Sequence, residues 1–293
     1  MVDLWGWDIG RFVWFCAAGK AFFPGVWLLI LAAAIPLSKR VLVVNLIRYA
    51  CLVLGIVLVF LSATPLNKWI YMIWAVSFLA FLLVIVRPPQ GGKRAYLPRI
   101  VFVFICVAAL AVELPFHFCQ KMPRGNFKKL YVIGDSVSAG IGSKGERIWP
   151  AILGEKYGVE VTNLSVAGAT VGSILPRAGK VDDDNAIVLL EIGGNDLLSL
   201  TPQRVFEQNL RSLLQKVVRP NRSVLMLELP LAPWHIGYGR IQRELAAEFG
   251  VVLIPKSFLA DIFGTKGATV DLAHLSPDGH KIMAGKIGFL LGN

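Results

Sequence analysis

Three long stretches in the first half of the chain contain hardly any charged residues. They span residues 41–62, 69–86 and 99–118, and a shorter uncharged stretch spans residues 21–37. A helix that crosses the hydrocarbon core of a bilayer needs about 20 predominantly apolar residues. These stretches therefore predict an all-α transmembrane domain of about four helices in residues 1–126.

The charge of the chain is divided in the same way as its hydrophobicity. Residues 1–126 carry 12 of the 30 Lys and Arg side chains but only three of the 19 Asp and Glu side chains. Basic residues beside membrane spans set the topology and contact lipid headgroups. The positive charge therefore indicates a membrane as the partner of these residues, and it does not indicate nucleic acid.

Basic residues are distributed unevenly among the loops between the predicted spans. The first and third loops contain Lys39, Arg40, Arg87, Lys93, Arg94 and Arg99. The second loop contains only Lys68. The positive-inside rule places the first and third loops in the cytoplasm, so we expect both ends of the chain to be extracytoplasmic. Basic residues after the last span oppose this orientation, but the rule is weaker before a large folded domain.

The N-terminal segment is rich in aromatic residues, with Trp5, Trp7, Phe12, Trp14 and Phe15. Aromatic side chains favour the membrane–water interface, which indicates an interfacial anchor. The alternative is that they form a wall of an acyl-chain entrance. The segment lacks the basic start of a signal peptide, so we expect no cleavage there.

Glu113 and His117 lie one helical turn apart near the outer end of the fourth predicted span. Ionisable residues inside a membrane often have a functional role. At the interface, we expect these two to pair with each other or with the domain that follows. The four cysteines of the chain show neither the spacing of a disulfide framework nor that of a metal site.

Residues 127–293 alternate short apolar stretches with longer mixed ones, as in a soluble domain. We expect strands at 128–134, 160–165, 186–192, 222–229 and 250–255. We expect helices at 147–157, 169–177, 202–218, 237–249 and 276–291. Strands that alternate with helices are typical of an α/β domain, with a parallel sheet covered on both faces.

Chemistry in such domains gathers at the carboxyl ends of the strands. Ser136 follows the first predicted strand, Gly168 the second and Asn195 the third, and Asp271 and His274 precede the last helix. This set supplies a nucleophile, a base, an orienting carboxylate and oxyanion donors. The sequence therefore predicts acyl transfer chemistry at this edge of the sheet.

Each of these residues has a physical role in that chemistry. Ser136 needs a base to take its proton, and His274 can supply it. Asp271, three residues earlier, can hold the far nitrogen of the ring. The backbone amides of Ser136 and Gly168 and the side-chain amide of Asn195 can stabilise an oxyanion, and glycine at 168 allows a close backbone approach.

Other polar residues are better explained by structural roles than by catalytic or metal-binding ones. His280 is a rival base, but its spacing from Asp278 places the two on opposite sides of the chain. The acidic run at residues 182–184 is typical of a solvated loop and not of a metal site. Asp135 and Ser138 are expected to support the nucleophile loop. We expect no cofactor and no metal.

Four short blocks, "GDSVS", Gly168, "GGND" and "DLAH", occur in the order found in the SGNH (GDSL) hydrolase family, which residues 127–293 resemble. The resemblance is closest to the small thioesterase and lysophospholipase subgroup. It implies a three-layer, flavodoxin-like fold with Ser136, Asp271 and His274 as the catalytic triad. It also implies Ser136, Gly168 and Asn195 as the oxyanion hole. Leu275 stands where the family often has proline after the histidine, which leaves the shape of that loop open.

The resemblance and the predicted spans together indicate a membrane-anchored serine esterase that acts on acyl esters, above all those of membrane lipids. Two alternatives remain open at this point. The protein could remove acetyl groups from a cell-surface glycan, or it could be a non-catalytic membrane scaffold that binds a partner through its hydrolase domain. An acyl-chain length series separates the first two, and serine-directed labelling separates both from the third.

Overall fold

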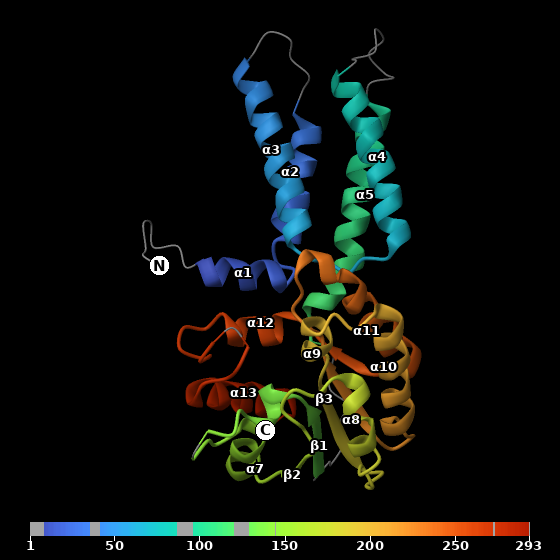
Figure 1. The fold of residues 1–293 in the computed structure, drawn as a ribbon. Coiled ribbons are helices and arrows are strands. Elements are labelled where there is room, and N and C mark those ends of the chain that lie inside the picture. The colour runs from blue at the N-terminus through green and yellow to red at the C-terminus, as the bar shows by residue number, and fades with distance from the viewer. Residues whose placement is uncertain are drawn as a thin grey trace.

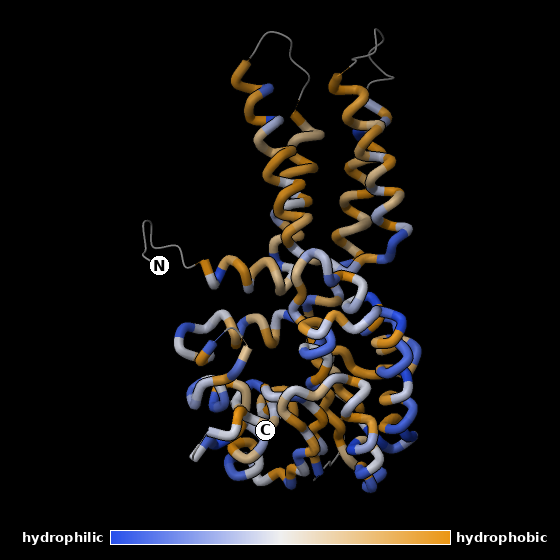
Figure 2. Tube along the Cα trace, in the orientation of Figure 1, coloured by the Kyte–Doolittle hydropathy of each residue, from blue (hydrophilic) through white to orange (hydrophobic). Residues whose placement is uncertain are grey.

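The computed structural model describes residues 9–35, 42–86, 96–119, 129–143, 145–271 and 273–292. Figure 1 shows two pairs of helices that rise from one side of an α/β domain. The helices of the first part are α1 (Ile9–Ala17), α2 (Phe22–Ala34), α3 (Leu42–Leu61), α4 (Lys68–Val86) and α5 (Leu97–Glu113), which continues as the 3-10 turn η2 (Leu114–His117). Figure 2 shows that these helices are hydrophobic along most of their length.

Three helical segments, α3, α4 and α5 with η2, are long and apolar enough to cross a membrane. In the range of the span expected at residues 21–37, the helix α2 has 13 residues, and residues 36 and 37 lie outside the described part of the chain. Helix α2 follows α1 after a bend of 81°, and Gly19 in this bend has a φ of +75°. The described residues therefore contain three candidate spans, or four if the bent pair is taken as one.

Helices α2 and α3 pack closely because glycines face each other. A Cβ atom added at Gly55 would lie 2.9 Å from the carbonyl oxygen of Gly25. Small residues let helix backbones approach in membranes, where packing and not the hydrophobic effect drives association. Larger side chains, among them Phe22, Phe81 and Phe102, are fully buried between the two helix pairs.

The sheet of the second part contains five parallel strands in the order β2-β1-β3-β4-β5. The strands are β1 (Lys129–Gly134), β2 (Glu160–Asn163), β3 (Ala186–Glu191), β4 (Ser223–Leu227) and β5 (Val252–Ile254). This order is that of flavodoxin-like folds, in which the chain reverses direction across the sheet between β1 and β3. The expected α/β class with a parallel sheet is confirmed.

Helices cover both faces of the sheet, so the domain has three layers. Alternate residues of β1 point to opposite faces, with Tyr131 and Ile133 in one core and Leu130 and Val132 in the other. The first face is covered by α8 (Val171–Ala178), α10 (Gln203–Val217) and α11 (Ile236–Phe249). The second face is covered by α7 (Trp149–Tyr157), α12 (Ser257–Phe263) and α13 (Pro277–Leu290). Three short helices complete the domain: α6 (Ser136–Ala139), α9 (Gly194–Leu198) and the 3-10 turn η3 (Pro233–His235).

The carboxyl edge of the sheet faces the apolar helices. Glu228 directly follows β4 and accepts a hydrogen bond of 2.7 Å from Arg243, which in turn binds Glu113 at the end of α5. Lys256 follows β5, and its Nζ donates to the carbonyl oxygen of Ala63 after α3 at 3.0 Å. Because all strands are parallel, the edge at which β1 ends is the same edge.

The predicted pairing of Glu113 is confirmed. Its Oε1 atom lies 3.1 Å from Nε2 of His117, and both of its oxygens accept from Arg243 of the α/β domain. Trp14 of the N-terminal aromatic segment also contacts this domain, because its ring lies 5.1 Å from that of Phe263. Trp5, Trp7 and most of the basic residues used for the orientation lie outside the described residues.

Candidate active site

Ser136 is the first residue of α6, and only Asp135 separates it from β1. The turn that presents it is held by Asp135, whose Oδ1 accepts a hydrogen bond of 3.1 Å from the amide of Val137. Gly134 leaves room for a neighbour, because a Cβ atom there would lie 2.7 Å from Glu191 Oε2. The Ser136 side chain is therefore placed at the rim of the sheet by a tight strand-to-helix turn.

His274 and Asp271 are joined directly. Nδ1 of His274 lies 2.7 Å from Oδ2 of Asp271, and the other carboxylate oxygen accepts from the amides of Ala273 and His274, both at 2.8 Å. The amide of Ala273, then the ring and amide of His274, lower the pKa of Asp271 to about 2. Asp271 is thus ionised at neutral pH and holds Nδ1 of the ring. This leaves Nε2 as the nitrogen for proton transfer.

Asn195 is the second residue of α9, which follows β3. Its Nδ2 donates to Asp135 Oδ2 at 3.2 Å and to the carbonyl oxygen of Ala169 at 3.1 Å. The Ala169 contact brings the loop after β2 against the loop after β3, and the Asp135 contact brings both against the turn of Ser136. The structure thereby gathers three of the four sequence blocks around one point.

Gly168 lies in the loop after β2 with a φ of +76°. A Cβ atom at this position would meet no atom within 4 Å. The sequence suggested glycine here for a close approach of the backbone, and the structure gives a different reason. Positive φ favours glycine, and its hydrogen-only side chain leaves the space beside its amide open.

The fourth block acts on the residue next to Ser136. Burial raises the pKa of the Asp135 carboxyl, and the His274 ring partly offsets this rise. Among the described residues, no hydrogen bond joins Ser136 Oγ to the His274 ring. Catalytic hydrogen bonds in free enzymes are often long and shorten only with substrate, so this geometry does not remove His274 as the base.

A buried carboxyl group lies behind Ser136 that sequence reasoning missed. Glu191 ends β3, and its Oε2 accepts a hydrogen bond of 2.8 Å from Ser138, which in turn accepts from the Trp149 indole at 3.2 Å. Burial, and then the charge of Asp135, raise the pKa of Glu191 well above its ordinary value. An acid at the end of the apolar run "AIVLLE" was the signal in the sequence.

His280 has a different environment from His274. Its Nδ1 accepts a hydrogen bond of 3.2 Å from the amide of Trp149, and its Nε2 lies 3.3 Å from Glu146 Oε1. Glu146 also accepts from the amides of Ile141 and Gly142 in the loop after Ser136. Both ring nitrogens of this buried histidine are therefore occupied by contacts to neighbouring segments. This argues against His280 as the catalytic base.

The residues that the structure describes contain no cluster of three His, Cys, Asp or Glu side chains able to hold a metal ion. In the acidic run at residues 182–184, Asp184 pairs with Arg222 at 3.0 Å.

Residues 132–282 match the GDSL-like Lipase/Acylhydrolase family. The chain belongs to this family. The matched range includes all four blocks at the carboxyl edge, from the turn of Ser136 to the Asp271 and His274 loop. The expectation of a GDSL-type ester hydrolase is thus confirmed.

Two relatives of this GDSL hydrolase are similar over its α/β part. Esterase TesA of Pseudomonas aeruginosa is 33% identical over 150 residues, which cover 47% of this chain and 74% of the relative. A protein of Escherichia coli named thioesterase 1/protease 1/lysophospholipase L1 is 33% identical over 144 residues, which cover 46% of this chain and 68% of the relative.

A solved structure supports the fold of the same part. The psychrotrophic esterase EstA of Pseudoalteromonas, inhibited by monoethylphosphonate, superposes with a TM-score of 0.51 at 22% identity. The superposition covers 56% of this chain and 97% of EstA. The α/β part of this chain therefore shares its fold with nearly the whole of EstA.

Proposed function

We propose that the protein is a membrane-anchored serine hydrolase that cleaves acyl esters of membrane lipids through an acyl-enzyme. The observation that carries the proposal is the 2.7 Å contact between Asp271 and His274 at the sheet edge that presents Ser136. An ionised carboxylate on one ring nitrogen orients the ring and stabilises the imidazolium that forms during proton transfer.

In the proposed reaction, Nε2 of His274 takes the proton of Ser136 Oγ while the oxygen attacks the ester carbonyl carbon. The amides of Ser136 and Gly168 and the Asn195 side chain donate to the resulting oxyanion. His274 then returns the proton to the leaving alcohol as the C–O bond breaks. A water molecule, deprotonated by His274, attacks the acyl-enzyme, which releases the carboxylic acid and restores Ser136.

Asn195 must change one contact to take part in this reaction. Its amide has two hydrogens, and in the free protein both point to protein acceptors, Asp135 and Ala169. A carbonyl oxygen bound beside Ser136 would replace one of these acceptors as negative charge develops on it. Substrate binding and oxyanion stabilisation would therefore be linked through the Asn195 amide.

The position of the site supports lipids as the substrate class. The carboxyl edge that presents Ser136 is also the edge that meets the apolar helices, through Lys256 and Ala63 among others. A site at this level can reach esters at a membrane surface without extraction of the whole lipid. The E. coli relative is named a thioesterase and lysophospholipase, which is consistent with acyl chains as the recognised group.

The arrangement of the helices supports an extracytoplasmic hydrolase domain. Figure 1 shows that α3 begins, α4 ends and α5 begins at the end of the helix pairs remote from the α/β domain. The basic residues Lys39 and Arg94 belong to the loops that connect these remote ends in sequence. The positive-inside rule assigns those loops to the cytoplasm, which would leave the hydrolase domain on the opposite side.

An acyl-chain series from acetyl to palmitoyl esters, measured in detergent and in liposomes, tests the proposal. We expect turnover to rise with chain length and to be higher in liposomes. A fluorophosphonate should label the wild-type protein and not Ser136→Ala. Strict preference for acetyl esters would favour a glycan O-deacetylase instead, and absence of labelling would favour a non-catalytic scaffold.

A further inference from the structure

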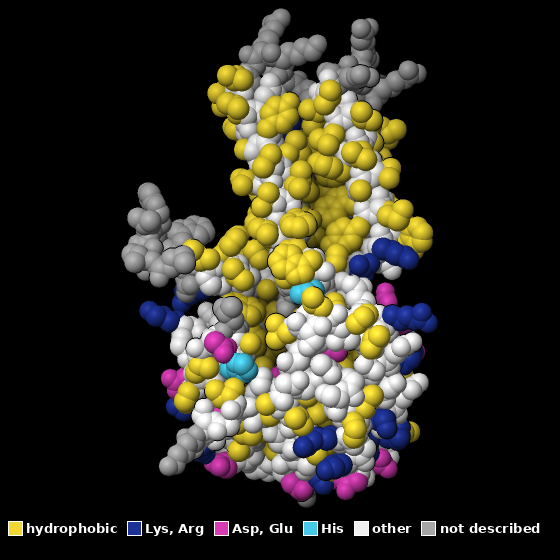
Figure 3. All heavy atoms as spheres, in the orientation of Figure 1, with side chains coloured by type: hydrophobic (Ala, Val, Ile, Leu, Met, Phe, Trp, Pro, Cys, Tyr) yellow, Lys and Arg dark blue, Asp and Glu magenta, His cyan; other side chains and the backbone are white. Residues whose placement is uncertain are grey.

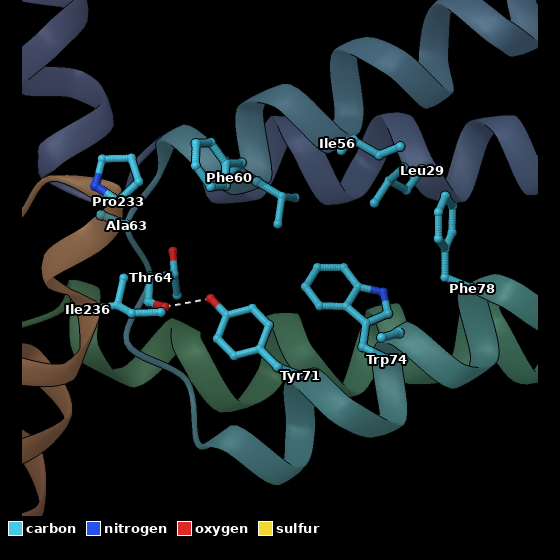
Figure 4. Close-up of a pocket in the computed structure, with 12 residues that line it drawn as sticks. Leu29, Ile56, Phe60, Ala63, Thr64, Tyr71, Trp74, Phe78, Pro233 and Ile236 are labelled. Atoms are coloured by element: carbon cyan, nitrogen blue, oxygen red, sulfur yellow. Dashed lines mark hydrogen bonds between the residues drawn. The ribbon is translucent and has the colours of Figure 1, made fainter.

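A pocket of about 340 Å³ lies between α3 and α4 where these helices meet the hydrolase domain. Its walls are formed by apolar and aromatic side chains, among them Phe60, Tyr71, Trp74 and Phe78, and Ile236 of α11 closes it on the domain side (Figure 4). Figure 3 shows a hydrophobic hollow between the two helix pairs, directly above the hydrolase domain. We call this space the junction pocket.

The junction pocket belongs to the part of the protein that is suited to a bilayer. Helices α3 and α4, which form its long walls, are both candidate spans. Tyr71 and Phe78 line it seven residues apart on α4, which corresponds to about 10 Å along the helix axis. A pocket that opens sideways at this depth faces hydrocarbon and not water, so the available occupant is the acyl chain of a lipid.

Positive charge borders the domain end of the junction pocket. Ile236, Arg240 and Arg243 lie on one face of α11, because they are four and three residues apart. Ile236 lines the pocket. Arg243 donates its guanidinium hydrogen bonds to Glu113 and Glu228. Arg240 lies between Ile236 and Arg243, and its Nε is buried without a hydrogen-bond partner in the described part of the chain.

A second cation lies at the domain end of α4. Lys68 is the first residue of α4 and is exposed, three residues before Tyr71 of the pocket lining. Figure 3 shows Lys and Arg side chains beside the base of the helix pair, next to the hollow. The nearby carboxylate of Glu113 is already bound by Arg243 and His117. An anionic phosphate at this level would meet two positive charges that no described carboxylate neutralises.

We propose that the junction pocket binds one acyl chain of an anionic membrane phospholipid, with the phosphate held by Arg240 and Lys68. The lipid fills the space between α3 and α4 and touches Pro233 and Ile236 of the hydrolase domain. It thereby fixes the domain against the membrane surface at a place separate from Ser136. The inference rests on the membrane anchoring in the proposed function and not on the hydrolytic reaction.

Photo-crosslinking of the full-length protein tests the acyl-chain part. The protein is placed in phosphatidylcholine vesicles that contain a trace of phosphatidylglycerol with a diazirine in one acyl chain. We expect labelled peptides from α3 and α4 around the pocket lining, in Ser136→Ala as in the wild type. Ala75→Trp fills the pocket and should lower this labelling at least about fivefold, whereas Val76→Trp, on the neighbouring exposed position of α4, should not.

The headgroup part has its own control. Arg240→Gln and Lys68→Gln together should lower the labelling several-fold, and Arg204→Gln, an exposed residue of α10, should leave it unchanged. Unlabelled phosphatidylglycerol should compete, and extra phosphatidylcholine should not. Equal labelling of Ala75→Trp and Val76→Trp, with fluorophosphonate labelling retained in both, would overturn the proposal that the junction pocket binds an acyl chain. Equal competition by both lipids would overturn the recognition of an anionic headgroup.

Discussion

Arg243 of α11 donates hydrogen bonds of 2.6 and 2.9 Å to the two carboxylate oxygens of Glu113, at the end of α5. Its Nε donates to Glu228, directly after β4, at 2.7 Å. One buried guanidinium therefore connects the last apolar helix to the carboxyl edge of the sheet. The ring of Phe116 lies 3.8 Å from the same guanidinium and shields it.

Removal of this connection should destabilise the whole protein. In Arg243→Leu, two buried carboxylates lose their shared cation, and breaking a buried ion pair by removing one partner costs about 3–5 kcal/mol. Chemical unfolding in detergent measures the loss. Arg211→Gln, which removes the exposed pair with Glu248, is the matched control and should cost no more than about 1 kcal/mol. Equal losses in the two variants would show that Arg243 does not join the two parts.

Substitutions at the proposed triad should nearly abolish turnover. Ser136→Ala and His274→Ala are each expected to lower kcat on a soluble butyrate ester by about 10⁴-fold or more. Asn195→Ala should lower kcat by about 10²–10³-fold, the effect of one oxyanion donor. His280→Asn, which changes a buried histidine that holds loops, should lower kcat far less than His274→Ala. The opposite order for the two histidines would reassign the base.

The stability of the protein should depend on pH through Asp135. Burial raises the pKa of this carboxyl to about 6, from 3.8. Between about pH 4 and pH 6 the folded protein holds a proton that the unfolded chain has released. The stabilisation is therefore present at low pH and is lost as the pH rises to about 6, by at most about 3 kcal/mol.

Denaturant unfolding at a series of pH values can isolate this contribution. The difference in unfolding free energy between wild type and Asp135→Asn should fall between about pH 4 and pH 6, because asparagine does not titrate. The same comparison with Asp278→Asn, which changes an exposed aspartate paired with Lys281, should show no such fall. A flat difference for Asp135→Asn would mean that this carboxyl is ionised throughout.

The orientation in the membrane can be read from cysteine accessibility. In a background with the exposed Cys119 replaced by serine, a cysteine at the exposed position Lys180 should react with an impermeant maleimide added to intact cells. A cysteine at Lys39, in the first basic loop, should react only after the membrane is opened. Reversed labelling would place the hydrolase domain in the cytoplasm and would contradict a substrate on the outer surface.

Sequence patterns alone were sufficient for the class of the fold and the family, and they supplied the division of the chain and the candidate site residues as predictions. The spacing of apolar residues along the chain reflects local secondary structure. For this reason, every long helix and every strand of the hydrolase domain was predicted. The helices α6, α9 and α12 were not predicted. They contain four, five and seven residues, too few to show a helical period, and they form because the surrounding domain holds their ends.

Only the tertiary structure decided how the two parts face each other. Glu113 and Arg243 are separated by 130 residues, and Asp135 and Asn195 by 60. No local pattern encodes such contacts, because they arise from the packing of elements that are far apart in the chain. The burial that raises the pKa of Glu191, the second role of Arg243 at Glu228 and the junction pocket all follow from that packing. The sequence by itself therefore determined which chemistry was available, and the folded arrangement determined that this chemistry lies at the edge of the sheet that faces the apolar helices.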